Sequence, residues 1–170
     1  QVMCVEAAGG GLLWGIDLPT RFAAEVPLWY TGQCPLIDGP QAVIAVGGQA
    51  LLAGVDLATG QIAWQTPNPR GLKMSHSSIM LMTIAGVRTY VYAATVMIVG
   101  VAAEPGESFR PGDLLWESGD FDATVIAPSP VRVGEDRIFQ TAGYGAGSIM
   151  LQVGRAGDSF RVRTLYRHRP

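Results

Sequence analysis

A strand–turn–strand pattern recurs along this chain of 170 residues and constrains its fold more than any other sequence feature. The clearest copy is residues 51–64, LLAGVDLATGQIAW. Its first strand ends at Asp56, and Gly60 supplies a turn residue that can adopt a positive φ without steric cost. Ile62 and Trp64 alternate with their neighbours, so they share one face of the returning strand. This stretch predicts a tight antiparallel hairpin.

Two further copies of this hairpin can be aligned with it. The first copy ends at Trp14 and the third ends at Trp116. Gly112 takes the position of Gly60 in the third copy, where about six extra residues lengthen the turn. The three tryptophans are 50 and then 52 residues apart. A repeat of this period predicts an array of similar units or a propeller.

A second kind of hairpin lies between the copies. Residues 34–45, 77–92 and 129–140 each read as a strand, a turn containing Gly or Asp, and a strand. Each repeat is therefore four short antiparallel strands. A weaker last hairpin, residues 148–166, has no Trp at the repeat position and is either diverged or terminal. We expect one all-β domain in four parts, with residues 1–22 as the second half of one repeat, followed by residues 23–69, 70–120 and 121–170.

Composition limits the classes of partner. The net charge of −2 offers no electrostatic case for nucleic acid. Apolar residues make up 48% of the chain and charged residues 15%, which fits buried strands or a chain that buries surface against a partner. The longest charge-free apolar run, residues 89–103, is shorter than the roughly 18 residues of a spanning helix. Its β-branched and aromatic residues favour two buried strands over the alternative of a transmembrane helix.

The segment from Gly54 to Trp64, which follows an AxDxxTGxxxW-type pattern, resembles the repeat of the quinoprotein-type β-propellers, the pyrroloquinoline quinone (PQQ) repeat family. The resemblance covers nearly the whole chain. It implies four-stranded antiparallel blades around a central axis, with each Trp packed between neighbouring blades. Closed rings have up to about eight blades. We therefore expect a partial β-propeller of about three and a half blades.

The resemblance says less about activity. Many members bind no quinone and act as interaction scaffolds in the periplasm or at the cell surface. Members that bind quinone use a pair of adjacent cysteines, a Trp platform and a calcium-holding set of Glu and Asn. Here Cys4 and Cys34 are thirty residues apart, no motif supports Trp29 as a platform, and Asn68 is the only Asn. Two buried free thiols are favoured, with a disulfide in an oxidising compartment as the alternative.

We therefore predict a non-catalytic interaction module in an extracytoplasmic assembly, without a metal or a cofactor. The alternative is part of a PQQ-dependent oxidoreductase whose catalytic residues lie mainly in blades that this sequence lacks. The sequence begins inside a repeat, as a processed product, a fragment or part of a longer protein would. An open stack exposes apolar sheet faces. We expect another protein chain or missing blades to complete the ring, and residues 1–22 to pair with strands from outside the chain.

The loops that lead into the first strand of each blade are expected to open at one mouth of the channel. The candidate ligand or partner residues there are Trp29, Tyr30, Gln33, Lys73 and His76. Lys73 and His76 would meet an anionic group, and the two aromatic residues would stack on a ring or a sugar. The competing interpretations are a backbone hydrogen bond from His76 to a neighbouring blade, and packing of both aromatic residues between blades.

Other chemistry-bearing groups are few. Three acids, Glu117, Asp120 and Asp122, follow the third Trp and are interpreted as a solvated turn, with a cation site as the alternative. The glycine-rich stretch of residues 143–147 resembles a phosphate loop only superficially, because no helix is expected to follow it. We interpret this stretch as a turn between strands. The arginines near the C-terminus are interpreted as a solvated strand edge.

Overall fold

The computed structural model describes residues 1–28 and 32–169. Its strands form one two-stranded sheet, β1–β2, and three four-stranded antiparallel sheets, β3–β6, β7–β10 and β11–β14. The elements are β1 (Val2–Val5), β2 (Leu12–Ile16), α1 (Leu18–Phe22), β3 (Leu36–Asp38), β4 (Gln41–Ala45), β5 (Ala50–Asp56), β6 (Ile62–Pro67), β7 (Met80–Ile84), β8 (Val87–Ala94), β9 (Met97–Ala102), β10 (Leu114–Ser118), β11 (Val131–Val133), β12 (Arg137–Ala142), β13 (Gly147–Ala156) and β14 (Ser159–His168).

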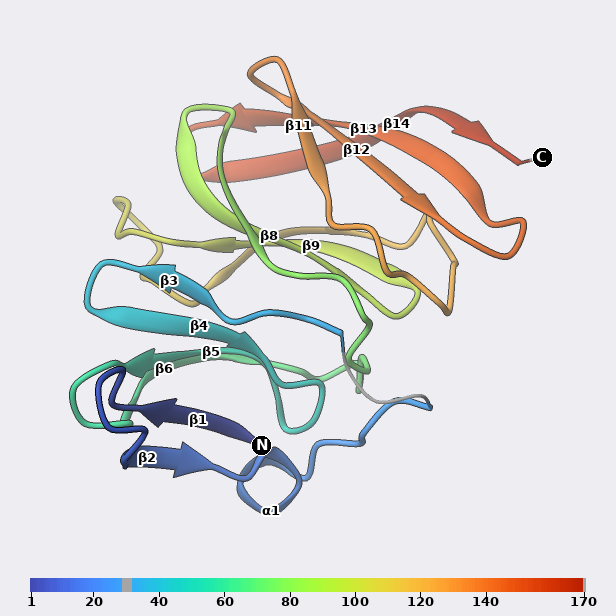
Figure 1. Ribbon diagram of the computed structural model, residues 1–170. Helices are drawn as coiled ribbons and strands as arrows, with labels where there is room; N and C mark the ends of the chain where they lie inside the picture. The colour runs from blue at the N-terminus through green and yellow to red at the C-terminus, as the bar shows by residue number, and fades with distance from the viewer. Residues whose placement is uncertain (29–31, 170) are drawn as a thin grey trace.

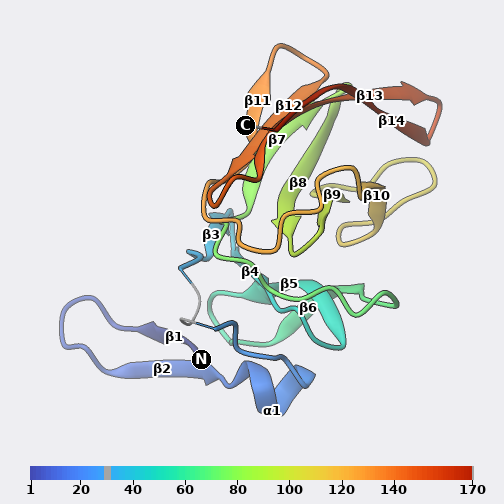
Figure 2. The same ribbon diagram turned by 90° about the vertical axis from the view of Figure 1, so that its right-hand side faces the viewer.

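The sheets follow one another in chain order, face to face, from β1–β2 at one end to β11–β14 at the other (Figure 1). In each four-stranded sheet the strands pair in sequence order. Turned by 90°, the first strands β3, β7 and β11 lie toward one side of the stack and the last strands toward the other (Figure 2). This arrangement is a partial β-propeller, and it confirms the expected fold class. The blade boundaries stay a prediction, because a connecting loop can be assigned to either neighbouring blade.

The register of the outer hairpins confirms the alignment of the three copies. Each hairpin has a β-bulge next to its tryptophan, and the tryptophan then lies opposite one residue of the preceding strand. Those opposed pairs are Trp14 with Cys4, Trp64 with Gly54, and Trp116 with Gly100. The sequence period of about fifty residues therefore places all three indoles at one equivalent position of successive blades.

The core consists of separate apolar layers between consecutive sheets. Strands β8 and β9 lie in the middle of the stack, and nearly all of their residues are buried. They correspond to the long apolar run of the sequence, so the prediction of two buried strands is confirmed. Among residues 1–28 and 32–169, no helix combines the length and the hydropathy required to cross a membrane.

Tryptophans and glycines make the contacts between blades. Trp14 covers Gly60 in the turn of the next blade, where an added Cβ would lie 2.6 Å from the indole Cγ. Trp64 covers Gly112 in the same way, at 2.6 Å from Cε3. Asp56 stabilises the Gly60 turn, because its Oδ1 accepts a hydrogen bond of 2.8 Å from the backbone N–H of Thr59 in the same turn. The repeat glycines Gly60 and Gly112 are thus each contacted by the tryptophan of the preceding blade.

One short helix was not anticipated from the sequence. Asp17 caps α1, since its Oδ1 accepts a 2.9 Å hydrogen bond from the Thr20 N–H, and Pro19 lies in the first turn. Leu18 and Phe22 are buried against the face of the β3–β6 blade. The helix therefore covers apolar surface beside the two-stranded sheet.

The cysteines differ from the expectation in their burial. Both are free thiols, but Cys34 is exposed and Cys4 is only partly buried. Cys34 lies in the loop before β3. The prediction of two buried thiols is therefore wrong.

Candidate functional site

The loops that lead into the first strands are tied to one another by a repeated hydrogen bond. The Cys34 N–H donates to Ser78 Oγ at 3.0 Å, and the Ser78 N–H donates to Ser129 Oγ at 3.1 Å. A further bond of 3.0 Å runs from the His76 N–H to the Ile126 carbonyl of the next loop. These bonds hold successive loops at the same end of their blades.

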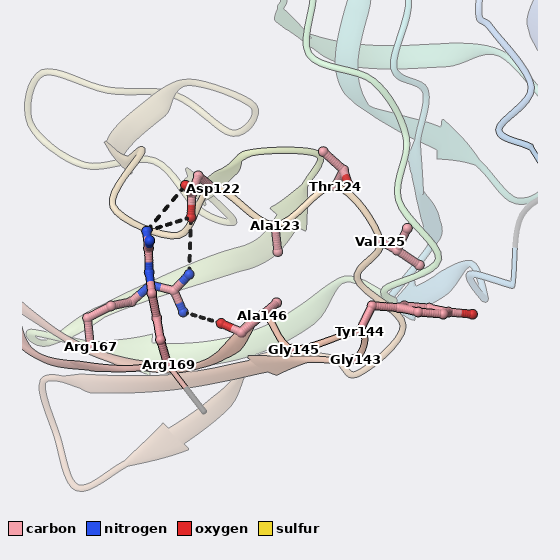
Figure 3. Close-up of a pocket in the computed structure, with 10 residues that line it drawn as sticks. All are labelled: Asp122, Ala123, Thr124, Val125, Gly143, Tyr144, Gly145, Ala146, Arg167 and Arg169. Carbon is pink, nitrogen blue, oxygen red and sulfur yellow. Dashed lines mark hydrogen bonds and ion pairs between the residues drawn. The ribbon is translucent and has the colours of Figure 1, made fainter.

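A groove runs between these loops, and we call it the loop groove. It consists of two adjoining cavities of about 330 and 260 Å³ that share Thr124 and Val125. The larger cavity lies between residues 25–28 and 73–76. The smaller one lies between residues 122–125, the 143–146 turn and the end of β14 (Figure 3). Three blades thus contribute to one hollow surface.

The larger cavity combines an ion pair with exposed apolar groups. Lys73 Nζ lies 2.5 Å from Glu25 Oε2, and more than half of each side chain is exposed. An exposed pair of this kind stabilises a fold by less than about 1 kcal/mol. Val26 is 54% exposed and Leu28 is 75% exposed on the same loop. This wall therefore offers apolar surface with paired charges beside it.

The smaller cavity is built around Asp122. Its Oδ1 accepts a hydrogen bond of 3.1 Å from Arg167, and its Oδ2 lies 3.4 Å from Arg169. The hydrogen bond from Arg167 is the chief reason that the pKa of Asp122 lies below its usual value. The Arg167 guanidinium also lies 4.3 Å above the ring of Phe121 and donates to the Ala146 carbonyl at 2.6 Å. Arg167 is thus an anchored side chain, which corrects the interpretation of a solvated strand edge at this arginine, while the other arginines of β14 are exposed as expected.

The residues 143–146 form the turn between β12 and β13, as expected from the sequence. Tyr144 stands at its tip with a positive φ of 54° and is 86% exposed. Figure 3 shows its ring extending from the turn at the end of the cavity near Val125. Tyr144 is not among the residues predicted from the sequence, although an aromatic residue between glycines of a short turn has few neighbours to pack on. This pattern is the signal that could have found it.

Only part of the predicted site lies in the loop groove. Lys73 and His76 line the larger cavity. Gln33 lies elsewhere, in a cavity of about 200 Å³ that β1 also lines, and its Nε2 donates to the Ala45 carbonyl at 3.1 Å. Trp29 and Tyr30 lie outside the described residues. Any joint role of the five residues stays a prediction.

The three acids that cluster in the sequence point to different partners. Glu117 pairs with Arg70, and Asp120 Oδ2 accepts a 2.5 Å hydrogen bond from Thr164. Asp122 forms ion pairs with Arg167 and Arg169, as described above. Within the part of the chain that the structure describes, no three His, Cys, Asp or Glu side chains gather as metal ligands would.

The comparison with protein families decides the classification. The family model described as outer membrane protein assembly factor BamB matches residues 1–159. The chain belongs to this family of PQQ-like repeat proteins. The match ends at the first residue of β14, so that the last strand lies almost wholly beyond it. A search of curated proteins finds no match. Family membership and the blades agree on a PQQ-like propeller module.

Proposed function

We propose that the chain is a non-catalytic propeller module that binds a partner protein in its loop groove. The observation that carries this proposal is the exposure of Leu28 and Tyr144 in a groove whose charged side chains lie beside them. Buried aromatic and arginine anchors dominate the binding energy of protein interfaces. The groove offers the aromatic Tyr144 from one blade and the apolar Leu28 from another, and a segment with apolar side chains would cover both.

The charges of the groove favour this function over quinone binding. A quinone with three carboxylates requires several cations that are free to pair with it. Lys73 already pairs with Glu25, while Arg167 and Arg169 both pair with Asp122. The residues of the groove therefore do not fit the quinone, and we propose a module without a cofactor. The alternative role as part of an oxidoreductase would need residues from other blades.

We further propose an extracytoplasmic assembly as the setting. The description of the matched family refers to a factor in outer membrane protein assembly, and that description supports the proposal. The open stack supports the idea that other blades or another chain complete the ring. Protease protection of the native protein in intact cells tests the location. If the protein resists external protease both before and after the outer membrane is permeabilised, the extracytoplasmic location is contradicted.

Peptide selection tests the groove. Peptides from a displayed random library would be selected on the wild-type chain, and their Kd values measured by calorimetry. We expect Leu28→Ala and Tyr144→Ala each to weaken binding at least about tenfold. Leu114→Ala is the matched control, because this leucine is 43% exposed on β10 and lines neither cavity of the loop groove. Selected peptides that bind the groove variants and the wild type equally would refute the groove as the site.

A titration with PQQ tests the alternative function. We expect neither saturable quenching of tryptophan fluorescence nor a shift of the quinone's near-ultraviolet absorbance on mixing. Saturable binding that Arg169→Ala weakens would instead favour the oxidoreductase alternative.

A further inference from the structure

A second hollow lies between the edge strands of two neighbouring complete blades. β6 and β10 are the last strands of their sheets, on the side of the stack away from the first strands. A cavity of about 470 Å³ lies between the end of β6, the start of β10, and the β9–β10 and β13–β14 turns. Figure 2 shows these turns and the segment after β6 reaching the same side of the stack. We call this cavity the rim groove, and it shares no lining residue with the loop groove.

The lengthened turn of the third repeat forms one wall of the rim groove. This β9–β10 turn, residues 103–113, carries the roughly six residues that the other copies of the hairpin lack. Ser108 Oγ donates a 2.7 Å hydrogen bond to Asp158 Oδ2 in the β13–β14 turn. The Phe109 ring meets the Phe160 ring edge-on, with 6.2 Å between centroids. The extra residues are thus fixed against the next blade, and their wall needs no ordering when a ligand binds.

The strands contribute apolar side chains to the rim groove. Leu114 and Leu115, at the start of β10, line it, and Leu114 is 43% exposed. Pro67, the last residue of β6, and Pro69 line it as well. Because proline restricts its own φ and has no N–H, these two residues offer an apolar surface with little conformational freedom to lose. An apolar side chain of a ligand would find a preformed contact here.

The two charged side chains that line the rim groove are both carboxylates. They are Asp113, directly before β10, and Asp158; within the described part of the chain no Lys, Arg or His lines this cavity. Asp158 Oδ1 accepts a 3.1 Å hydrogen bond from Arg155, so its charge is partly neutralised. Asp113 Oδ2 accepts a 2.7 Å hydrogen bond from the Arg110 backbone N–H, which leaves its charge unbalanced. The groove therefore complements a cation and not an anion.

Neighbouring junctions of the stack lack this combination. The cavity of about 730 Å³ between β2 and β6 has Asp17 and Arg21 as its charged lining residues, and their charges cancel. At the junction of β10 and β14, Thr164 donates a 2.5 Å hydrogen bond to Asp120 and ties the last strand to the loop after β10. Unbalanced negative charge beside apolar surface is therefore a property of the rim groove and not of every blade junction.

We propose that the rim groove binds an extended segment of a partner protein that carries an arginine or lysine next to an apolar side chain. The cation pairs with Asp113, and the charge of Asp158 adds to the attraction. The methylene stem of the basic residue and its apolar neighbour cover Leu114 and the proline wall. The same negative charge disfavours nucleic acid and anionic lipid as occupants. The inference goes beyond the proposed function, because it assigns a second surface with a different partner chemistry.

A displayed library of random peptides tests this surface. The selection uses the full chain with Leu28→Ala and Tyr144→Ala, so that the loop groove contributes little. We expect the selected peptides to be enriched in Arg and Lys over Asp and Glu. In the same background, Leu114→Ala and Asp113→Asn should each raise their Kd, measured by calorimetry, at least about tenfold. Asn retains an oxygen that can accept the Arg110 N–H, so Asp113→Asn removes the charge without removing the acceptor.

Ile37→Ala and Asp120→Asn are the matched controls. Ile37 is 59% exposed on β3, and neither residue lines the rim groove. Circular dichroism confirms that each variant is folded. Added salt should weaken binding to the parent chain more than binding to Asp113→Asn, because salt screens the ion pair. This salt dependence separates loss of the charge from a general structural effect.

The outcomes for the two grooves can be told apart. A selection that yields no specific peptide, peptides without enrichment in basic residues, or equal Kd values for the parent and the rim-groove variants would overturn the inference. Peptides whose binding depends on the loop groove should bind Asp113→Asn as tightly as the wild type. Their retention would show that a failure of the rim groove leaves the proposed function intact.

Discussion

Trp64 lies flat on Gly54, the residue directly opposite it on the neighbouring strand. An added Cβ at Gly54 would fall inside the indole, with Nε1 and Cε2 as its nearest atoms. The same indole also contacts Gly112 of the next blade and stacks on Tyr90 of that blade. The tryptophan thus contacts two glycines, one from each blade.

Gly54→Ala should destabilise the fold by about 1–3 kcal/mol, because the methyl group overpacks a rigid contact. The free energy of unfolding in urea measures the effect. Gly143→Ala is the control, since no atom lies within 4 Å of its added Cβ and its φ is not positive. Equal unfolding midpoints for the two variants would contradict the role of Gly54.

Tyr90 links two blades through a polar network. Its hydroxyl donates to Asp38 Oδ2 at 2.7 Å and accepts a 3.0 Å hydrogen bond from Gln41 Nε2. Burial is the chief reason that the pKa of Tyr90 is raised. Tyr90→Phe should cost about 1–3 kcal/mol of unfolding free energy, because it leaves both partners without that hydroxyl. Tyr144→Phe, on an exposed turn, should change stability by less than about 0.5 kcal/mol. Similar losses in both variants would count against the network.

Acid should weaken the cap of α1 at low pH. Hydrogen bonds from Thr20 and Gln1 lower the pKa of Asp17 to about 2, below its usual value of 3.8. A lowered folded-state pKa stabilises the fold above pH 3.8, and this contribution is lost as the pH falls toward 2. The melting temperature should therefore fall more between pH 4 and pH 2 in the wild type than in Asp17→Ser, which caps the helix without titrating. Parallel curves would show that Asp17 makes no such contribution.

The thiols should differ in reactivity. Cys34 is exposed and Cys4 is partly buried, so a thiol reagent should modify Cys34 first and Cys4 in a slower phase. Cys34→Ser should leave only the slow phase. The reaction is followed by the absorbance of the coloured group that the thiol reagent releases. Without reductant, two thiols should react under denaturing conditions. A single fast phase for both cysteines would contradict their different exposure.

The hairpin repeat could be predicted because its signals are local. Gly60 and Trp64 are four residues apart, and their spacing alone sets the turn and the face of the strand. The polar partners were not predictable in this way. Asp38 and Tyr90 are 52 residues apart, and only the stacking of two blades brings them together. The helix α1 was missed because five residues carry too little periodicity to show a helical face.

The candidate site shows the same division. Lys73 and His76 were selected from their place in an entering loop, and they do line the larger cavity. Gln33 occupies an equivalent loop position, yet it lines another cavity because the blade before it has only two described strands. Asn68 was noted only for its rarity, while in the structure its Nδ2 donates to the Gly48 and Leu72 carbonyls at 2.8 and 2.9 Å and ties the loop between two blades.

The sequence by itself determined the repeat, the blade phase and the alternation of buried faces, because turn glycines and strand periodicity act over a few residues. The tertiary structure alone decided which side chains meet across blades. It placed Arg167 on Asp122, and it placed the Tyr90 hydroxyl on Asp38. Such contacts depend on the register and length of strands that are far apart in the chain, and no local pattern encodes them.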